Sequence, residues 1–159
     1  MIKDPARAYR ESAVRGASPV GLIVILYEEI IRSIRRAQRA LGAGKIEDRS
    51  NALTHAIEVV GHLQGVINFE KGGTLAQELV TFYSLARAKL LEANVKPQDK
   101  LLEDLAVEFA KMKEAWQRVE RDLSTQGAEG GSRTEVPALV ASEKIHTDPD
   151  SRRLSLERR

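Results

Sequence analysis

The 159-residue chain contains no cysteine, and aromatic residues make up only 4% of it. Without cysteine there are no disulfides, no thiolate zinc sites, no iron–sulfur clusters and no cysteine nucleophile. Hydrophobic residues account for 42% of the chain, an ordinary fraction that must be mostly aliphatic because aromatics are so few. This composition favours an all-α protein with a core of Leu, Ile, Val and Ala.

An excess of one charge sign is also missing. Lysine and arginine number 25 against 23 acidic residues, which gives a formal net charge of +2. So small a net charge creates no field that would draw the chain to nucleic acid or to an anionic membrane. The arginines between 32 and 39 share a helix face with Glu28 and Glu29, with no aromatic residues between them for base stacking. We therefore expect no nucleic-acid partner.

Long hydrophobic runs are absent as well. The most apolar stretch, VGLIVILYEEII, is interrupted by Glu28 and Glu29 well before the roughly 20 apolar residues that a bilayer-spanning helix needs. A basic start followed by a small-residue cleavage site, the pattern of a signal peptide, is not seen. These observations predict a cytoplasmic protein without direct membrane insertion.

The patterns of common catalytic and metal sites are missing too. Four-helix bundles that bind two metal ions use Glu-x-x-His pairs, whereas the nearest pair here, Glu58 and His62, is spaced by four. Gly72-Gly73 lacks the Lys-Ser/Thr ending of a phosphate-binding loop. We predict no catalytic residue, no metal site and no cofactor, and we expect that the protein is not an enzyme.

Four stretches carry apolar residues at intervals of three and four, the period of an amphipathic α-helix. They predict helices at about 19–41, 46–70, 75–93 and 98–123. Ser18 and Pro19 suit the start of the first helix, and Thr74 with Gln77 has the form of a capping box for the third. Because short connections place consecutive helices side by side, we predict an antiparallel up-down-up-down four-helix bundle.

The chain divides into three parts on this reading. Residues 1–17 form a leader that the helices do not need, and residues 18–124 form the bundle. Residues 125–159 have scattered Gly, Pro and Ser, charges of both signs and no sustained apolar stripe. Such a segment cannot bury enough apolar surface to fold, so we predict a disordered C-terminal tail.

Each predicted helix carries apolar residues outside its main stripe. The main stripes include Leu75 and Phe82 in the third helix, and Met112, Val119 and Leu123 in the fourth. The residues left over are Val24, Ile25 and Ile31, then Val59 and Val66, then Val80, Leu85 and Leu91, and finally Leu101 and Val107. They widen the core, support self-association, or form a groove for amphipathic helices of another protein.

Short motifs also follow one another in a distinctive order along residues 1–123. They are Pro5, Tyr9, Ser12-Ala13-Val14, Ala17-Ser18-Pro19, Leu22, Leu26-Tyr27, then EKGGTLAQELVTFYSLARAKLLEAN at 70–94, and Ala115-Trp116. In order, spacing and helix boundaries this series resembles the FliS family of flagellar export chaperones. The chain departs from that family at position 21, where Gly replaces the usual capping-box Glu or Gln and leaves the helix start to Ser18 and Pro19 alone.

The resemblance implies a bundle that binds the disordered C-terminal segment of flagellin, prevents its premature polymerisation and promotes its delivery to the flagellar type III export gate. It further implies a short, mobile leader whose Tyr9 covers part of the flagellin-binding surface and helps to contact the export-gate membrane protein in the loaded state. We expect a monomer or weak dimer. The predicted partner-binding residues are Tyr9, Val14, Val24, Ile25, Ile31, Val59, Val66, Leu85, Leu91 and Val107. The alternative is a bundle that uses these apolar lines only to form a homodimer.

Overall fold

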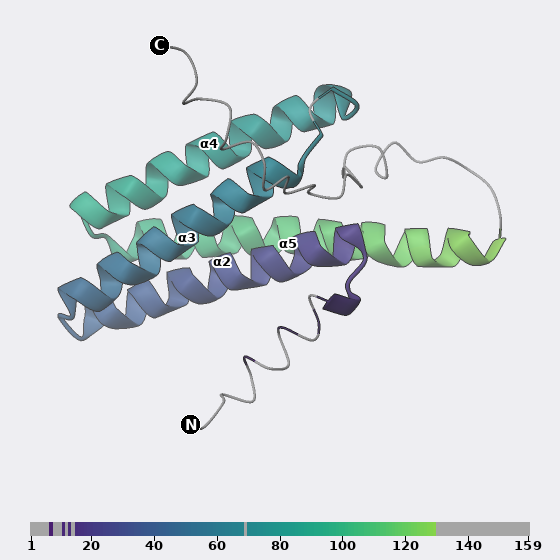
Figure 1. Ribbon diagram of the computed structural model, residues 1–159. Helices are drawn as coiled ribbons and strands as arrows, with labels where there is room; N and C mark the ends of the chain where they lie inside the picture. Colours follow the sequence, from purple (N-terminus) through teal and green to yellow (C-terminus); the bar gives the residue numbers. More distant parts are fainter. Residues whose placement is uncertain (1–6, 8–10, 12, 14, 69, 130–159) are drawn as a thin grey trace, which may run out of the picture.

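The computed structural model describes residues 7, 11, 13, 15–68 and 70–129. Four long helices fill most of this range: α2 (Pro19–Gly42), α3 (Ile46–Val66), α4 (Gly73–Val95) and α5 (Asp99–Glu129). Figure 1 shows consecutive helices side by side and running in opposite directions. Since α5 also packs along α2, the helices close a ring around one core. The predicted all-α, antiparallel four-helix bundle is confirmed.

Two helix ends differ from the prediction. α3 ends at Val66 rather than near 70 because Asn68 starts a turn, in which its side-chain oxygen accepts hydrogen bonds from the backbone N–H groups of Glu70 and Lys71 at 3.1 Å each. α5 continues past 123 to Glu129. The predicted boundary put Ser124 at the end of the bundle and Thr125 at the start of the tail, but both residues are helical. Their hydroxyls donate hydrogen bonds to backbone carbonyl oxygens one turn earlier, at 2.9 and 3.0 Å. Residues 130–159 of the predicted tail, and Tyr9 and Val14 of the leader, lie outside the described residues.

The start of α2 contacts a residue of α5, the last helix. As predicted, the Ser18 hydroxyl oxygen accepts a hydrogen bond from the Gly21 backbone N–H at 3.0 Å, and Pro19 opens the helix. The same hydroxyl donates to Glu120 of α5 at 3.4 Å. A Cβ at position 21 would lie 2.7 Å from a Glu120 carboxylate oxygen. Gly21 therefore leaves room for this negative charge beside the positive end of the α2 dipole. As expected, no acidic side chain of the first turn joins Ser18 and Pro19 at the helix start; Glu120 only accepts a hydrogen bond from the Ser18 hydroxyl.

The predicted capping box at α4 is also wrong. The helix begins at Gly73, so Thr74 is already inside its first turn, and no side chain caps the start. Gly73 has a φ of 54°, a left-handed conformation that glycine adopts without the steric cost that other residues meet. Of the two glycines after Lys71, Gly72 is thus the last residue of the loop and Gly73 the first residue of the helix.

Most aromatic residues in the described part of the chain gather at the centre of the core. The hydroxyl oxygens of Tyr27 on α2 and Tyr83 on α4 lie 2.7 Å apart and share a hydrogen bond, although both side chains are fully buried. Phe109 of α5 packs edge-on against Tyr27, with ring centroids 5.7 Å apart, and Phe82 packs against Phe109 at 5.4 Å. The buried Trp116 N–H meets no acceptor with full hydrogen-bond geometry among the described residues, yet it lies near enough to the Tyr27 hydroxyl to act on its pKa.

The buried tyrosine pair gives a first test of the core. Replacing Tyr83 with Phe leaves the Tyr27 hydroxyl without its partner, so we expect the free energy of unfolding to fall by about 1–3 kcal/mol. The double variant Tyr27→Phe/Tyr83→Phe should lose less than the sum of the two single variants because neither hydroxyl then needs a partner. Urea unfolding followed by the fluorescence of Trp116, the single tryptophan, measures all three. Strictly additive losses would mean that the hydroxyl pair contributes no coupling.

The same pair predicts an alkaline pH dependence. Burial raises the pKa of both Tyr27 and Tyr83 above the usual value. Below about pH 10 the folded and unfolded chains both keep these protons, and above it the unfolded chain loses them more readily. The tyrosine contribution to stability is therefore complete below about pH 10 and lost as the pH rises beyond it. Unfolding free energies at about pH 8 and about pH 11 should differ more for the natural chain than for the double Phe variant; equal differences would contradict the assignment.

Candidate partner-binding surface

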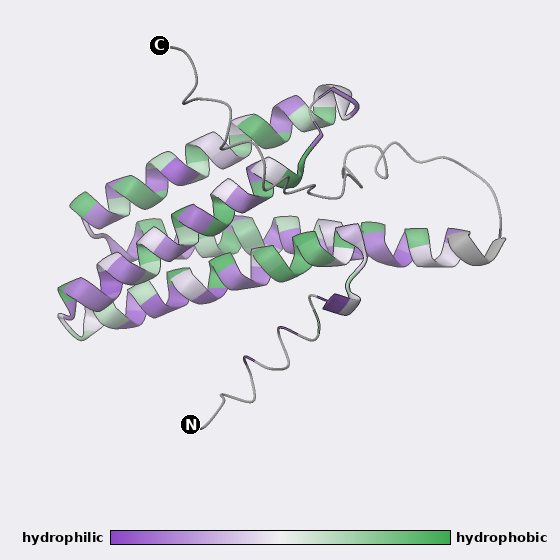
Figure 2. Cartoon of the chain, viewed as in Figure 1, coloured by the Kyte–Doolittle hydropathy of each residue, from purple (hydrophilic) through white to green (hydrophobic). Residues whose placement is uncertain are grey.

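Apolar side chains reach the surface mainly on α4. Among the described residues, the large apolar side chains that are exposed are Ile46, Leu75, Leu85, Leu91, Val95 and Val107. Four of these six belong to α4, and Figure 2 shows hydrophobic residues interspersed with hydrophilic ones along that helix. Single exposed hydrophobes are normal on any protein, but their concentration on one helix makes α4 the candidate for a partner-binding surface.

One edge of α4 faces α5, and two contacts fix its position. The Lys89 amino group lies 3.4 Å from a Glu108 carboxylate oxygen, and the Phe82 ring packs against Phe109. Leu75 lies seven residues before Phe82, and Leu85 lies three after it. Side chains at these spacings share a helix face, so both leucines lie along the same edge, where Leu75 is 41% exposed and Leu85 is 54% exposed.

The matching side of α5 is also apolar. Met112 follows Glu108 by one turn, and Val119 and Leu123 continue the row. All three are half-buried and pack against the core. The α4 and α5 backbones approach each other at fewer places than the other adjacent helices do, which leaves these side chains only partly covered. We call this surface the α4–α5 edge; it comprises Leu75, Phe82, Leu85, Met112, Val119 and Leu123.

Leu91 lies on the other edge of α4. Arg87, four residues earlier, donates a hydrogen bond to the Gln64 side chain of α3 at 3.1 Å, so this side of α4 faces α3. Leu91 is 55% exposed there. The two predicted contact residues of α4, Leu85 and Leu91, thus lie on opposite edges of the helix.

The other predicted contact residues are spread over the bundle. Val24 and Val59 are buried, with 7% and 5% of their surface exposed, and both belong to the core. Val59 lies four residues after His55, which contacts Glu29 of α2, so the second apolar line of α3 packs towards α2. Ile31 and Val66 are half-buried against the core, Ile25 is half-buried on α2, and Val107 is 39% exposed on α5. The predicted set is not one patch, and two of its members offer no free surface in this structure.

Sequence reasoning missed most of the α4–α5 edge. It assigned Phe82, Met112 and Val119 to the main stripes, where they do touch the core, but a helical wheel does not show that they also border the surface. The spacing of seven between Met112 and Val119 could have indicated that both side chains lie on one side of α5, the side that also carries Glu108. The sequence does not tell which two neighbouring helices are packed less closely, and here these are α4 and α5.

The α2–α3 and α2–α5 sides of the bundle carry networks of charged and polar side chains. Between α2 and α3, the Glu29 carboxylate accepts a hydrogen bond from Arg32 and lies 3.0 Å from a ring nitrogen of His55. Between α2 and α5, Arg35 pairs with Glu103, and Gln38 donates to the Glu103 and Asp99 carboxylates at 3.1 Å each. Hydrogen bonding to the Arg35 guanidinium lowers the pKa of Glu103 below its usual value. Polar partners within the chain therefore occupy these sides.

Two further observations bear on the kind of site. No helix in the described part of the chain is long and apolar enough to cross a membrane. Over the same residues, His, Asp and Glu side chains nowhere gather in groups of three or more that would suit a metal ion.

The burial pattern predicts opposite outcomes for two similar substitutions. Val59→Asp places a carboxylate in the core and should reduce the free energy of unfolding by at least about 3 kcal/mol. Leu85→Asp changes an exposed position in a helix and should cost about 1 kcal/mol or less. Urea unfolding of both variants, with helix content from circular dichroism, tests this. A stable Val59→Asp variant would show that the second line of α3 is free surface after all.

Known proteins resemble the chain over nearly the whole bundle. A family model described as flagellar protein FliS matches residues 1–123. The flagellar secretion chaperone FliS of Salmonella typhimurium is 31% identical over 126 residues, which cover 79% of this chain and 93% of that protein. FliSB of Pseudomonas aeruginosa is 28% identical over 106 residues, covering 67% of this chain and 84% of that protein. FliS of Bacillus subtilis is 24% identical over 131 residues, covering 82% and 97%.

The length of these matches agrees with the fold and with the motifs. The family match ends at residue 123, within α5, and it includes all of α2, α3 and α4. The family is one of chaperones rather than enzymes. The chain belongs to the FliS family of flagellar secretion chaperones.

Proposed function

We propose that this chaperone binds the disordered C-terminal segment of flagellin in the cytoplasm, prevents its premature polymerisation and promotes its delivery to the flagellar type III export gate. The proposal is supported by the name of its relatives, secretion chaperones of the flagellum. The structural observation that carries it is the concentration of exposed apolar side chains on α4, beside the half-covered α4–α5 edge.

An apolar edge of this kind suits an amphipathic helix. Leu75, Phe82 and Leu85 form a row on one helix, and Met112 and Val119 form a second row on its neighbour, so a partner helix can lay its apolar face between them. Each aliphatic side chain removed from water adds roughly 1.5–3 kcal/mol when fully buried. A segment covered in this way is withheld from self-assembly, because binding lowers the concentration of its free form.

The opposite edges of α4 favour a partner that wraps around the helix. Leu85 and Leu91 are six residues apart, or about 9 Å along the helix axis, and they face α5 and α3 respectively. One short helix cannot contact both edges, whereas a longer disordered segment can do so and fold as it binds. We propose that flagellin contacts both leucines in this way.

The other predicted residues keep a place in this proposal with different roles. Ile25, Ile31, Val66 and Val107 extend the contact surface to the remaining helices. Val24 and Val59 support that surface from the core, since both are buried. The leader residues Tyr9 and Val14 alternate between covering the bundle and contacting the export-gate membrane protein when flagellin is bound.

Calorimetric titration of the purified chain with the C-terminal segment of its own flagellin tests the proposal. We expect stoichiometric binding with a negative heat-capacity change, the sign of apolar burial. Leu85→Asp should weaken binding by about 2 kcal/mol, or roughly thirtyfold, as for a central contact residue. Ile46→Asp is the matched control because Ile46 is 69% exposed and lies on α3, away from the proposed contacts; its effect should stay within about 0.5 kcal/mol.

Two results would contradict the proposal. Equal affinities of the natural chain and Leu85→Asp, with helix content intact, would move the binding surface away from the α4–α5 edge. An absence of binding together with a concentration-dependent dimer in light scattering would favour the alternative, in which the exposed apolar residues contact a second copy of the chain.

A further inference from the structure

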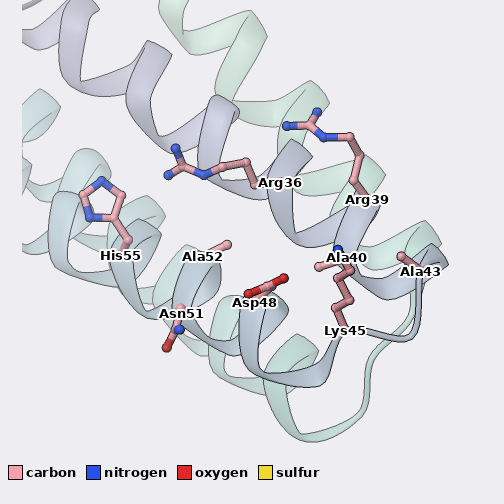
Figure 3. Close-up of a pocket in the computed structure, with 9 residues that line it drawn as sticks. All are labelled: Arg36, Arg39, Ala40, Ala43, Lys45, Asp48, Asn51, Ala52 and His55. Atoms are coloured by element: carbon pink, nitrogen blue, oxygen red, sulfur yellow. The ribbon is translucent and has the colours of Figure 1, made fainter. Parts of the chain in front are cut away.

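A pocket of about 560 Å³ lies between the end of α2 and the start of α3, away from the α4–α5 edge. Figure 3 shows that both helices line it, with Arg36 and Arg39 on α2 and Asp48, Asn51 and His55 on α3. Its volume falls within the range typical of ligand pockets. The proposed flagellin contacts do not use it.

Small side chains create the space. Ala40 of α2 and Ala52 of α3 form the apolar floor, each with only 7% of its surface exposed, and Ala43 adds a methyl group at the rim. Longer residues at these positions would fill the gap between the two helices. The alanines instead leave a floor on which a small apolar group can lie.

The rim carries more positive than negative charge. Arg36, Arg39 and Lys45 line the pocket against a single carboxylate, that of Asp48. Within the described residues, Arg39 and Lys45 form no ion pair. Arg36 lies 3.6 Å from the Glu29 carboxylate, which Arg32 and His55 also contact. Arg35, which lies on the α5 side of the same helix, differs from Arg39 because it forms an ion pair with Glu103.

The start of α3 adds to this positive potential. Lys45 occupies the position before the helix and makes no side-chain cap, so the first amide N–H groups of α3 lack a side-chain acceptor there. These groups carry the positive end of the helix dipole, which Glu47 and Asp48 of the first turn offset only in part. Helix start and cationic rim thus favour the same kind of ligand, one with negative charge.

We infer that this pocket is a docking site for an acidic peptide segment of a partner protein. Asp or Glu carboxylates of the segment pair with Arg39 and Lys45, and its small apolar side chains lie on the alanine floor. A free phosphate ion would gain nothing from that floor, and the lining has no Phe, Tyr or Trp on which a nucleic-acid base could stack. Since the pocket lies apart from the α4–α5 edge, the inference does not depend on flagellin binding.

The test uses two short blocked peptides, Ala-Glu-Ala-Glu-Ala and its neutral counterpart Ala-Gln-Ala-Gln-Ala, added to the isotope-labelled full chain. NMR amide shifts should change on adding the acidic peptide, mainly between residues 36 and 55, and much less with the neutral one. Arg39→Gln/Lys45→Gln should weaken binding about tenfold, because two charge-assisted contacts are lost. Both residues are exposed, so the bundle should stay folded, which circular dichroism verifies.

Lys111→Gln/Arg118→Gln is the matched control. It removes one lysine and one arginine that are exposed on α5, so the net charge changes equally, and binding should stay within about twofold. Equal weakening by both double variants would overturn the inference in favour of general charge attraction. An absence of shifts around the pocket would also overturn it, as would inorganic phosphate or a uridine oligonucleotide binding there more tightly than the acidic peptide.

Discussion

The hydrogen bond between Tyr27 and Tyr83 lies at the centre of the aromatic cluster in the core. It joins α2 to α4 across the core, and the rings of Phe109 and Phe82 pack around it. The contact between Phe82 and Phe109 joins α4 to α5, whose backbones approach each other at fewer places than those of the other adjacent helices. The side chains along that edge stay only partly covered. The proposed binding surface and this part of the aromatic core are thus built on the same two helices.

Charge and apolar surface are divided among the sides of the bundle. α2 uses its polar residues to hold its neighbours, through Glu29 towards α3 and through Arg35 and Gln38 towards α5. α4 has few such contacts and displays leucines instead. The binding and release of a partner proposed above are served better by apolar contact with little geometric constraint than by buried ion pairs, whose disruption leaves unpaired charges. The division keeps the fold stable while one helix stays available.

Periodicity was enough to predict the helices and their antiparallel order, because each apolar stripe has to be buried against another helix. Local capping was predicted less well. Ser18 was identified correctly, but the contribution of Glu120 could not be, since nothing in the sequence near Gly21 indicates a carboxylate that comes from a residue about a hundred positions later.

The candidate site shows the same limit. Off-stripe position identified Leu85, Leu91 and Val107 as exposed, yet it also selected Val24 and Val59, which the bundle buries. Spacing along one helix gives the direction of a side chain and not the distance to the next helix. Phe82 and Met112 were overlooked for that reason. The pocket between α2 and α3 was overlooked as well, because the hydrophobic pattern of a sequence does not show where alanines leave a gap between two helices.

The contact of Glu120 with the start of α2 joins two regions that are distant in the sequence. Its neighbour Val119 belongs to the α4–α5 edge, so one turn of α5 touches both the proposed binding surface and the point where the leader meets the bundle. A rotation of α5 that repacked Val119 would also draw the Glu120 carboxylate away from the Ser18 hydroxyl. The packing of α5 against α4 and the hydrogen bond at the start of α2 thus depend on adjacent residues of the same helix turn.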